Sequence, residues 1–258
     1  MSAKLKICSF NLRINTAKDG INQFTNRTGR ILDVIRKEMP DLIGFQEAND
    51  MMRDFLTDTL SADYTVIGCG REIDCRGESA AIAVRRGKFA VLSVDNFWLS
   101  FTPDVPGSTF GGDQSKCPRV TTCARLRVLE SGEYVRFCNT HLDHKGETAR
   151  LLGVAAIMQY LTRFDDRFIL TGDFNARPES NVITDVKALT HNGRPVKDAT
   201  EAVPVTFHDY GKTEHFCKID YIFTDAEPLP DESYAVIEPP IDGVYVSDHH
   251  PVVAYVKL

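Results

Sequence analysis

The stretch Val120–Asn139, VTTCARLRVLESGEYVRFCN, contains two strand-like runs, and in the first of them every second residue alternates with mostly polar neighbours. The first run covers Val120–Val128, and the second covers Tyr134–Asn139. Alternation with a period of two is typical of a β-strand, and Ser131 and Gly132 between the runs favour a tight turn. The stretch therefore predicts a hairpin of two antiparallel strands.

Further strands and helices are predicted on both sides of this hairpin. Consecutive strands joined by short turns cannot be parallel, so the pattern favours two packed sheets covered by helices over a doubly wound parallel sheet. Helical spacing of apolar residues predicts helices at 31–39, 55–60 and 151–161. Apolar runs predict strands at 5–10, 41–45, 64–68, 80–84, 89–98, 168–170, 219–223 and 252–256.

Length and composition limit the organisation and the partners of the protein. The chain has 258 residues and no repeat or Gly, Ser or Pro-rich linker, so we expect one domain spanning residues 1–258. Its 30 Lys and Arg against 36 Asp and Glu give a net charge of −6, which argues against a long basic surface for duplex nucleic acid. No apolar run approaches the ~20 residues of a membrane helix, and no signal peptide is present, so we expect a cytoplasmic protein.

The cysteine pattern argues against a zinc site. The chain contains seven cysteines, and none stand as Cys-x-x-Cys. Several, such as Cys8 and Cys138, lie inside apolar runs. We therefore expect free thiols in a reducing compartment.

Carboxylates, amides and imidazoles collect at the ends of the predicted strands, where a layered fold presents side chains to a cleft. Carboxylates suit Mg²⁺, which binds one or two of them and keeps waters or phosphate oxygens as its other ligands. One carboxylate at a strand end is more often a turn former or a cap, so the joint occurrence supports the prediction. The set comprises Asn11, Glu47, Glu78, His141, Asp143, Asp173, Asn175, Asp220, Asp248 and His249.

Six short motifs occur in one order along the chain: SFN (9–11), GFQE (44–47), NTHLD (139–143), GDFN (172–175), IDYIF (219–223) and SDHHPV (247–252). Together they resemble the endonuclease/exonuclease/phosphatase, or deoxyribonuclease I-like, superfamily, and the middle of the chain resembles an uncharacterised microbial subfamily of it. The resemblance implies an α/β fold, a four-layer α/β/β/α sandwich of two mainly antiparallel sheets flanked by helices. It also implies a phosphoric ester hydrolase that uses Mg²⁺ or Mn²⁺.

The resemblance implies a set of metal ligands. Glu47 matches the principal ligand, Asp248 matches the terminal metal-side carboxylate, and Asn11 matches a residue that contacts the metal or the phosphate. Arg13 stands where some members carry a carboxylate. That departure favours one metal over two.

The same resemblance implies which residues contact the attacking water and the phosphate. Asp173 and Asn175 match the pair that orients the attacking water and can deprotonate it. Asn175, like Asn11, is also a candidate for substrate binding. Arg119 is a candidate phosphate clamp, because its fork of donors fits a phosphate.

Two histidines are expected at the reacting phosphate, each oriented by a carboxylate. His141 matches the residue that stabilises the phosphate or protonates the leaving oxygen, and His249 matches the histidine of the last motif. We expect Glu78 to orient His141 and Asp220 to orient His249.

The substrate class follows from charge. A phosphorylated small molecule, a nucleotide or a short single-stranded nucleic acid is expected, with a DNA endonuclease or exonuclease as the alternative. A catalytically inactive binding module is disfavoured because the costly cluster of charges is complete. No membrane or protein partner is indicated. Several other residues are expected to be structural: Trp98 in the core, Asp143 in the turn after His141, and His144, His191, His208 and His215 at the surface or in turns.

Overall fold

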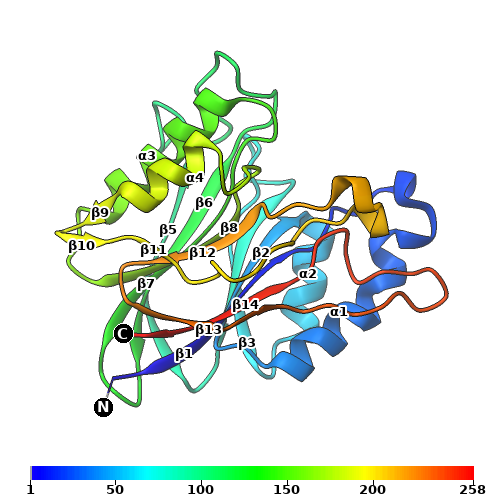
Figure 1. Ribbon diagram of the computed structural model, residues 1–258, viewed down its shortest axis with the longest axis horizontal. Coiled ribbons are helices and arrows are strands. Elements are labelled where there is room, and N and C mark those ends of the chain that lie inside the picture. Colours follow the sequence, from blue (N-terminus) through cyan, green and yellow to red (C-terminus); the bar gives the residue numbers. More distant parts are fainter. Residues whose placement is uncertain (1) are drawn as a thin grey trace.

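The computed structural model describes residues 2–258, and two six-stranded sheets packed face to face form its centre (Figure 1). The first sheet has the order β13 (Glu227–Ala235), β14 (Val252–Lys257), β1 (Lys4–Asn11), β2 (Leu42–Ala48), β4 (Ser79–Arg85), β3 (Tyr64–Ile67). The second has the order β11 (Lys197–Asp198), β12 (Asp220–Thr224), β8 (Arg167–Asp173), β7 (Tyr134–His141), β6 (Val120–Val128), β5 (Phe89–Trp98). A small ribbon pairs β9 (Thr190–His191) with β10 (Arg194–Pro195).

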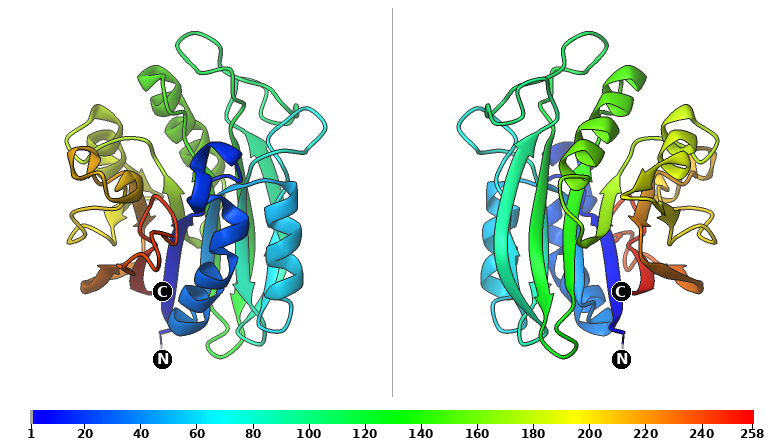
Figure 2. Two further views of the ribbon diagram at one scale, coloured as in Figure 1. Left: turned by 90° about the vertical axis from the view of Figure 1, so that its right-hand side faces the viewer. Right: turned by 90° about the vertical axis from the view of Figure 1, so that its left-hand side faces the viewer.

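Helices cover the outer faces of both sheets, as the two side views show (Figure 2). The helices α1 (Phe24–Glu38) and α2 (Asp50–Thr59) lie on the first sheet, and α3 (Glu147–Leu161) and α4 (Asn181–Ala188) lie on the second. Side chains cap two of them, because Asn49 accepts from the Met52 amide before α2 and Ser180 accepts from the Ile183 amide before α4. The predicted four-layer α/β/β/α sandwich of mainly antiparallel sheets is confirmed.

Short 3₁₀ helices occur at η1 (Ala17–Asn22), η2 (Asp209–Gly211) and η3 (Thr213–His215). Within residues 2–258, every helix is too short or too polar to cross a membrane.

Three hydrophobic cores lie between the four layers. Phe24 and Leu56 belong to the core between the first helical layer and the first sheet. Leu42 and Phe137 belong to the core between the two sheets, and Ile157 belongs to the core beneath α3. Burying apolar surface on both faces of each sheet holds the layers together.

Each sheet contains one parallel pair of strands, and this arrangement gathers polar residues at one edge. Strands β1 and β2 are parallel, as are β7 and β8, whereas the other pairs are antiparallel. The carboxyl ends of parallel strands meet at one edge of a sheet, and the antiparallel neighbours β4, β12 and β14 begin there. Polar residues at all of these ends therefore come together.

A polar seam joins the sheets near this edge. The buried Asn139 on β7 donates to the carbonyl oxygens of Phe45 and Ala81, on strands of the opposite sheet, at 2.8 and 2.9 Å. Its Oδ1 atom accepts from Gln46 at 2.7 Å. The sheets approach so closely here that a Cβ atom at Gly44 would overlap the Asn139 side chain. Glycine is required at this position by space.

The expectation that all cysteines are free thiols is wrong for one pair. Cys123 on β6 and Cys138 on β7 form a disulfide, whereas Cys8, Cys69, Cys75, Cys117 and Cys217 are free. The two bonded residues lie directly opposite each other in the predicted hairpin, with their Cα atoms 4.1 Å apart. Register places the two side chains in contact, and spacing in the sequence does not reveal the register.

Candidate active site

The polar strand ends line one cavity of about 470 Å³. Both sheets contribute to it: Glu47 from β2 of the first sheet, and His141 and Asp173 from β7 and β8 of the second. The cavity lining brings together Glu47, Glu78, Arg119, His141, Asp173, Asn175, Asp248 and His249, all of which the sequence analysis selected. A larger cavity of about 840 Å³ lies between α3 and the end of β5 with the segment that follows it, and its mixed polar and apolar lining includes none of these residues.

Asp173 lies at the centre of the site. Its Oδ2 atom accepts from the Asn11 amide at 3.0 Å, and it lies 3.6 Å from Nε2 of His141 and 3.8 Å from Nε2 of His249. Its Oδ1 atom accepts from the backbone N–H of Asn175 at 2.8 Å. Burial, followed by the nearby charge of Asp220, raises the pKa of Asp173. A raised pKa makes this carboxylate a stronger base than an exposed aspartate.

His249 and Asp220 form the predicted pair. The Nδ1 atom of His249 lies 2.8 Å from Oδ2 of Asp220, and both side chains are buried. Burial lowers the pKa of His249, but Asp220, together with Asp248 and Asp173, outweighs burial and raises the pKa to about 10. His249 is therefore a cation at neutral pH.

Asp173, Asp220 and His249 also form a group whose potential metal-ligand atoms lie within 4.8 Å of one another. An imidazolium has no free lone pair, so His249 in its protonated form cannot bind a metal. The hydrogen bond between His249 and Asp220 explains the cluster better than a metal centred on all three residues.

His141 has a different electrostatic environment. Burial, followed by the charges of Arg119 and Arg71, lowers its pKa well below the ordinary value. His141 is therefore neutral and can act as a hydrogen-bond donor.

The prediction that Glu78 orients His141 is wrong. Glu78 accepts from both terminal nitrogens of Arg71, with Nη1 to Oε2 at 3.0 Å and Nη2 to Oε1 at 2.5 Å. No hydrogen bond joins Glu78 to His141 within residues 2–258. Arg71 lies in the same loop as Glu78. Its bidentate ion pair uses both carboxylate oxygens of Glu78, so Glu78 does not orient His141.

Glu47 and Asp248 face the cavity and keep part of their bonding capacity free. Glu47 accepts from Asn11 at 3.1 Å and from the backbone of Ile14 at 2.8 Å, and its own backbone adopts a strained φ of 62°. Burial raises the pKa of Asp248, and the negative charge of Glu47 adds to this effect. Hard oxygen donors that repel each other in one cavity fit a hard divalent cation. The donor set at this position therefore fits Mg²⁺ or Mn²⁺.

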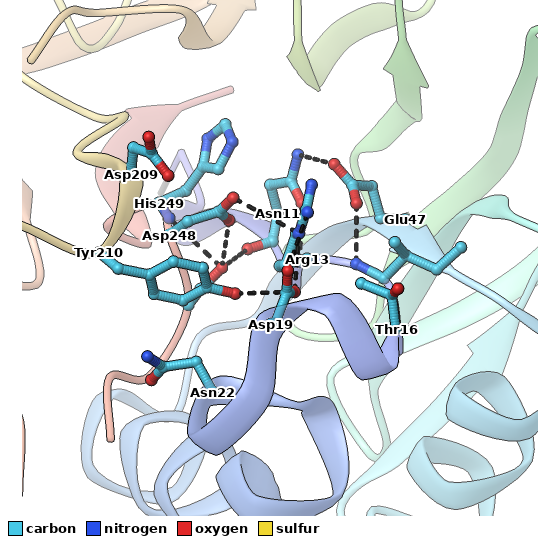
Figure 3. Close-up of polar contacts among 12 residues, drawn as sticks. Asn11, Arg13, Thr16, Asp19, Asn22, Glu47, Asp209, Tyr210, Asp248 and His249 are labelled. Carbon is cyan, nitrogen blue, oxygen red and sulfur yellow. Dashed lines mark hydrogen bonds and ion pairs between the residues drawn. The ribbon is translucent and has the colours of Figure 1, made fainter. Parts of the chain in front are cut away.

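Arg13 stands beside these carboxylates, where Figure 3 shows it between Asp19 and Asp248. It forms a bidentate pair with Asp19, at 2.9 and 3.0 Å, and its Nε atom lies 3.7 Å from Oδ2 of Asp248. The hydroxyl of Tyr210 also donates to Asp19, at 3.1 Å. Sequence reasoning noted Arg13 only as a departure, and Asp19 and Tyr210 carry no motif that could have revealed them.

Arg71 and His144 are cavity residues that the sequence analysis missed. His144 was expected to be an ordinary surface histidine, yet its Nδ1 atom lies 2.8 Å from Nη2 of Arg119. Arg71 lies in a polar loop whose path the sequence does not predict. The only feature of the sequence that points to Arg71 is its position before Glu78 in the same loop.

The remaining structural assignments are mixed. Trp98 is buried in the core, as predicted. Asp143 supports the turn after His141, since it accepts from the backbone of Lys145 and Gly146. His191 and His208 are both buried, and His191 is paired with Asp225, so the surface assignment is wrong for these two residues.

Comparisons with known proteins agree with this fold. A model of the endonuclease/exonuclease/phosphatase family matches residues 8–249. Over 268 aligned residues the chain is 26% identical to uncharacterized protein L388 of Acanthamoeba polyphaga mimivirus, covering 96% of this chain and 98% of that protein.

Two solved structures from Bacteroides are similar over almost their whole length. An endonuclease/exonuclease/phosphatase from Bacteroides vulgatus has 29% identity, covers 99% of each chain and gives a TM-score of 0.90. The mannosyl-6-phosphatase of Bacteroides thetaiotaomicron VPI-5482 has 25% identity, covers 98% of this chain and 99% of its own, and gives a TM-score of 0.81.

Proposed function

Because this chain belongs to the endonuclease/exonuclease/phosphatase family, we propose that it uses Mg²⁺ or Mn²⁺ to hydrolyse a phosphodiester or phosphomonoester of a small or single-stranded substrate. One observation supports this most directly. Asn11, His141 and His249 converge on one carboxylate oxygen of Asp173, in the cavity that also contains Glu47 and Asp248. A candidate general base, hydrogen-bond donors and candidate metal-binding carboxylates thus lie at one cavity.

The metal would be held by Glu47 and Asp248, with Asn11 as the third member of the set. The Asn11 amide nitrogen bridges Glu47 and Asp173, at 3.1 and 3.0 Å, so Asn11 fixes the ligand carboxylate relative to the base. When bound, the metal supplies Lewis-acid polarisation of a phosphate oxygen.

Asp173 is the proposed base for the attacking water. Its raised pKa lets it accept a proton as the water oxygen bonds to phosphorus and the ester P–O bond breaks. Asn175 holds this carboxylate through its backbone N–H and anchors its own amide on the Leu142 carbonyl at 3.0 Å. The side-chain oxygen of Asn175 remains for the water or the substrate.

The two histidines have different proposed roles. His249, kept protonated by Asp220, places a positive charge where negative charge develops on the phosphate. His141 is neutral and donates a hydrogen bond, which favours stabilising the phosphate over protonating the leaving oxygen. Glu78 contributes indirectly, by holding Arg71.

Arg119 is the proposed substrate-binding cation, and the substrate is proposed to be small. A cavity of about 470 Å³ suits a sugar phosphate or a nucleotide. The similar Bacteroides mannosyl-6-phosphatase supports a sugar phosphate among these.

A DNA endonuclease or exonuclease is the second candidate, because the family name includes both activities. A catalytically inactive binding module is disfavoured, because the buried charges around Asp173 are costly to keep without a reaction.

The test is a hydrolysis screen with Mg²⁺ or Mn²⁺ over sugar phosphates, nucleotides, a simple diester and single-stranded DNA and RNA. We expect at least one ester to be hydrolysed, with activity lost in EDTA and restored by the metal. A metal-loaded, folded protein that hydrolyses none of them would contradict the proposal. Full activity in EDTA, with bound metal excluded by elemental analysis, would contradict its metal dependence.

A further inference from the structure

One end of the active-site cavity carries a buried arginine with unused donors. The Arg119 side chain is only 4% exposed, and it lines the cavity beside Arg71 and His144. Its Nε and Nη1 atoms have no hydrogen-bond partner within the described part of the chain. We call the region formed by Arg71, Arg119 and His144 the basic end of the cavity.

The nearest carboxylates do not satisfy Arg119. Nε lies 3.6 Å from Oδ2 of Asp143, but that carboxylate already accepts from Ser115, Lys145 and Gly146. The other nearby carboxylate, Glu78, is bonded to Arg71. A buried guanidinium with unmade hydrogen bonds carries a desolvation cost that a ligand can remove.

Arg119 also fixes the state of His144. A guanidinium can only donate, so the 2.8 Å contact from Nη2 makes Nδ1 of His144 an acceptor. The neutral imidazole then carries its hydrogen on Nε2. His144, which is exposed, can therefore offer a donor at the rim of the cavity.

Arg71 is held rigidly at the same end. The Trp98 indole donates to the Arg71 carbonyl at 2.6 Å, and the Arg71 amide donates to the Glu78 carbonyl at 2.8 Å. Its side chain forms the bidentate pair with Glu78, and its Nε atom has no hydrogen-bond partner among residues 2–258. The Nε atom also lies 3.5 Å from Oε1 of Glu72. The loop therefore holds the guanidinium in place with one donor free, while Glu78 balances its charge.

The basic end adjoins the reacting centre at His141. His141 lies between the two, because its Nε2 atom is 3.6 Å from Asp173 while the same side chain also lines a small crevice with Arg71 and Arg119. The proposed metal ligands Glu47 and Asp248 make the other end of the cavity acidic. The cavity thus offers two chemically distinct binding regions.

We propose that the basic end binds a second anionic group of the substrate, a phosphate or a carboxylate, while the phosphoester to be cleaved lies at Asp173. This inference rests on the proposed function and narrows its substrate to phosphoesters that carry two anionic groups. Arg119 is the central donor, and Arg71 and His144 complete the site.

Matched substrate pairs test the proposal. Specificity constants are compared for glucose 1,6-bisphosphate against glucose 6-phosphate, and for adenosine 3′,5′-bisphosphate against adenosine 5′-monophosphate. In at least one pair the wild-type protein should prefer the bisphosphate at least about tenfold, on the scale of one charge-assisted hydrogen bond. In Arg119→Gln that ratio should fall to within about threefold of unity.

Two further variants keep this test independent of folding. His144→Ala removes an exposed side chain and should lower the ratio about threefold or more. Arg125→Gln removes an arginine that pairs with Asp166 outside the cavity, and its ratio should equal that of the wild type. Equal specificity for both members of both pairs, or an unchanged ratio in Arg119→Gln and His144→Ala, would overturn the inference.

A binding measurement separates this inference from the proposed function. In EDTA, calorimetric titration with the same four compounds should show tighter binding of a bisphosphate, and this advantage should be absent in Arg119→Gln. If a bisphosphate binds more tightly but no compound is hydrolysed in the presence of metal, the result would support anion binding at the basic end and contradict the proposed function. Hydrolysis without a preference for bisphosphates would support the proposed function and contradict anion binding at the basic end.

Discussion

The Nε atom of Arg13 lies 3.7 Å from Oδ2 of Asp248, while the same guanidinium forms a bidentate pair with Asp19 (Figure 3). Asp19 also accepts from Tyr210, so the arginine is anchored on the side away from the cavity. A fixed positive charge therefore stands next to one of the two proposed metal ligands. It partly neutralises Asp248 and opposes a second cation beside it.

Removing this charge should strengthen metal binding. For Arg13→Gln we expect the Mn²⁺ dissociation constant to fall about 3- to 10-fold, because a nearby like charge is lost. Isothermal titration calorimetry measures the constant, and it should give one metal per wild-type chain. Arg125→Gln, which loses the same charge outside the cavity, should leave the constant unchanged. Weaker binding in Arg13→Gln would contradict the electrostatic role.

Removing the charge of Glu47 should impair both binding and rate. Glu47→Gln keeps the shape of the side chain but loses the ligand charge, so we expect kcat/KM to fall at least about 100-fold, the scale of a lost electrostatic contribution. Mn²⁺ affinity measured by calorimetry should fall with it. Glu201→Gln, which alters an exposed glutamate paired with Lys187, should preserve both values. A Glu47→Gln protein with wild-type metal affinity would exclude Glu47 as a ligand.

Asp220 should control the charge of His249. Burial alone lowers the pKa of this imidazole, and Asp220 is the largest of the opposing influences that bring it to about 10. In wild type His249 stays protonated from acid through neutral pH. In Asp220→Asn we expect it to lose its proton at a markedly lower pH, and kcat at neutral pH to fall about 10- to 100-fold.

Histidine NMR titration of the metal-free protein measures this change directly. Asp225→Asn is the matched control, since it removes the carboxylate of another buried aspartate–histidine pair, with His191, outside the cavity. That control should lower stability but leave the titration of His249 unchanged. An unaltered His249 titration in Asp220→Asn would show that the pair is not electrostatically coupled.

Regular patterns in the sequence predicted most of the sandwich. The strand predicted at 89–98 has these bounds in β5, and the hairpin of β6 and β7 forms as expected. Helix α4 was not predicted, because it is only 8 residues long and contributes three buried apolar side chains. Strand β13 was also missed, because two prolines and mainly polar residues give it no clear alternation.

Contacts between site residues at strand ends could be predicted from the sequence. Contacts that depend on the path of a loop could not. Asp220 and His249 meet because β12 begins at the edge where the segment before β14 arrives. Glu78 was assigned to the wrong partner, because the fold of the preceding loop brings Arg71 onto it. Loop shape depends on distant contacts, such as the Trp98 bond to the Arg71 carbonyl, and spacing in the sequence does not contain them.

Close packing of the two sheets should make Gly44 intolerant of a side chain. An ideal Cβ at Gly44 would overlap Thr171 and Asn139 on the opposite sheet, so Gly44→Ala should lower the free energy of unfolding by about 1–3 kcal/mol. Gly29→Ala is the control: the added Cβ meets nothing within 4 Å inside α1, and the change should raise stability by about 0.5–1 kcal/mol. Urea unfolding measures both. Equal stability of Gly44→Ala and wild type would show that the sheets can separate without cost.

Long duplex DNA should be a poor substrate. Binding a duplex gains most of its affinity by releasing counterions from several phosphates, which requires several exposed cations along one face. The chain has a net charge of −6, and the cations nearest the reacting centre do not form an exposed row: Arg119 is buried, Arg71 is paired with Glu78, and Arg13 is paired with Asp19. We therefore expect the specificity constant for plasmid nicking, at fixed Mg²⁺ and about 0.15 M salt, to lie well below that for the best small phosphoester. Activity on that small ester should change little with added salt, whereas efficient plasmid nicking that falls steeply with salt would identify a duplex endonuclease instead.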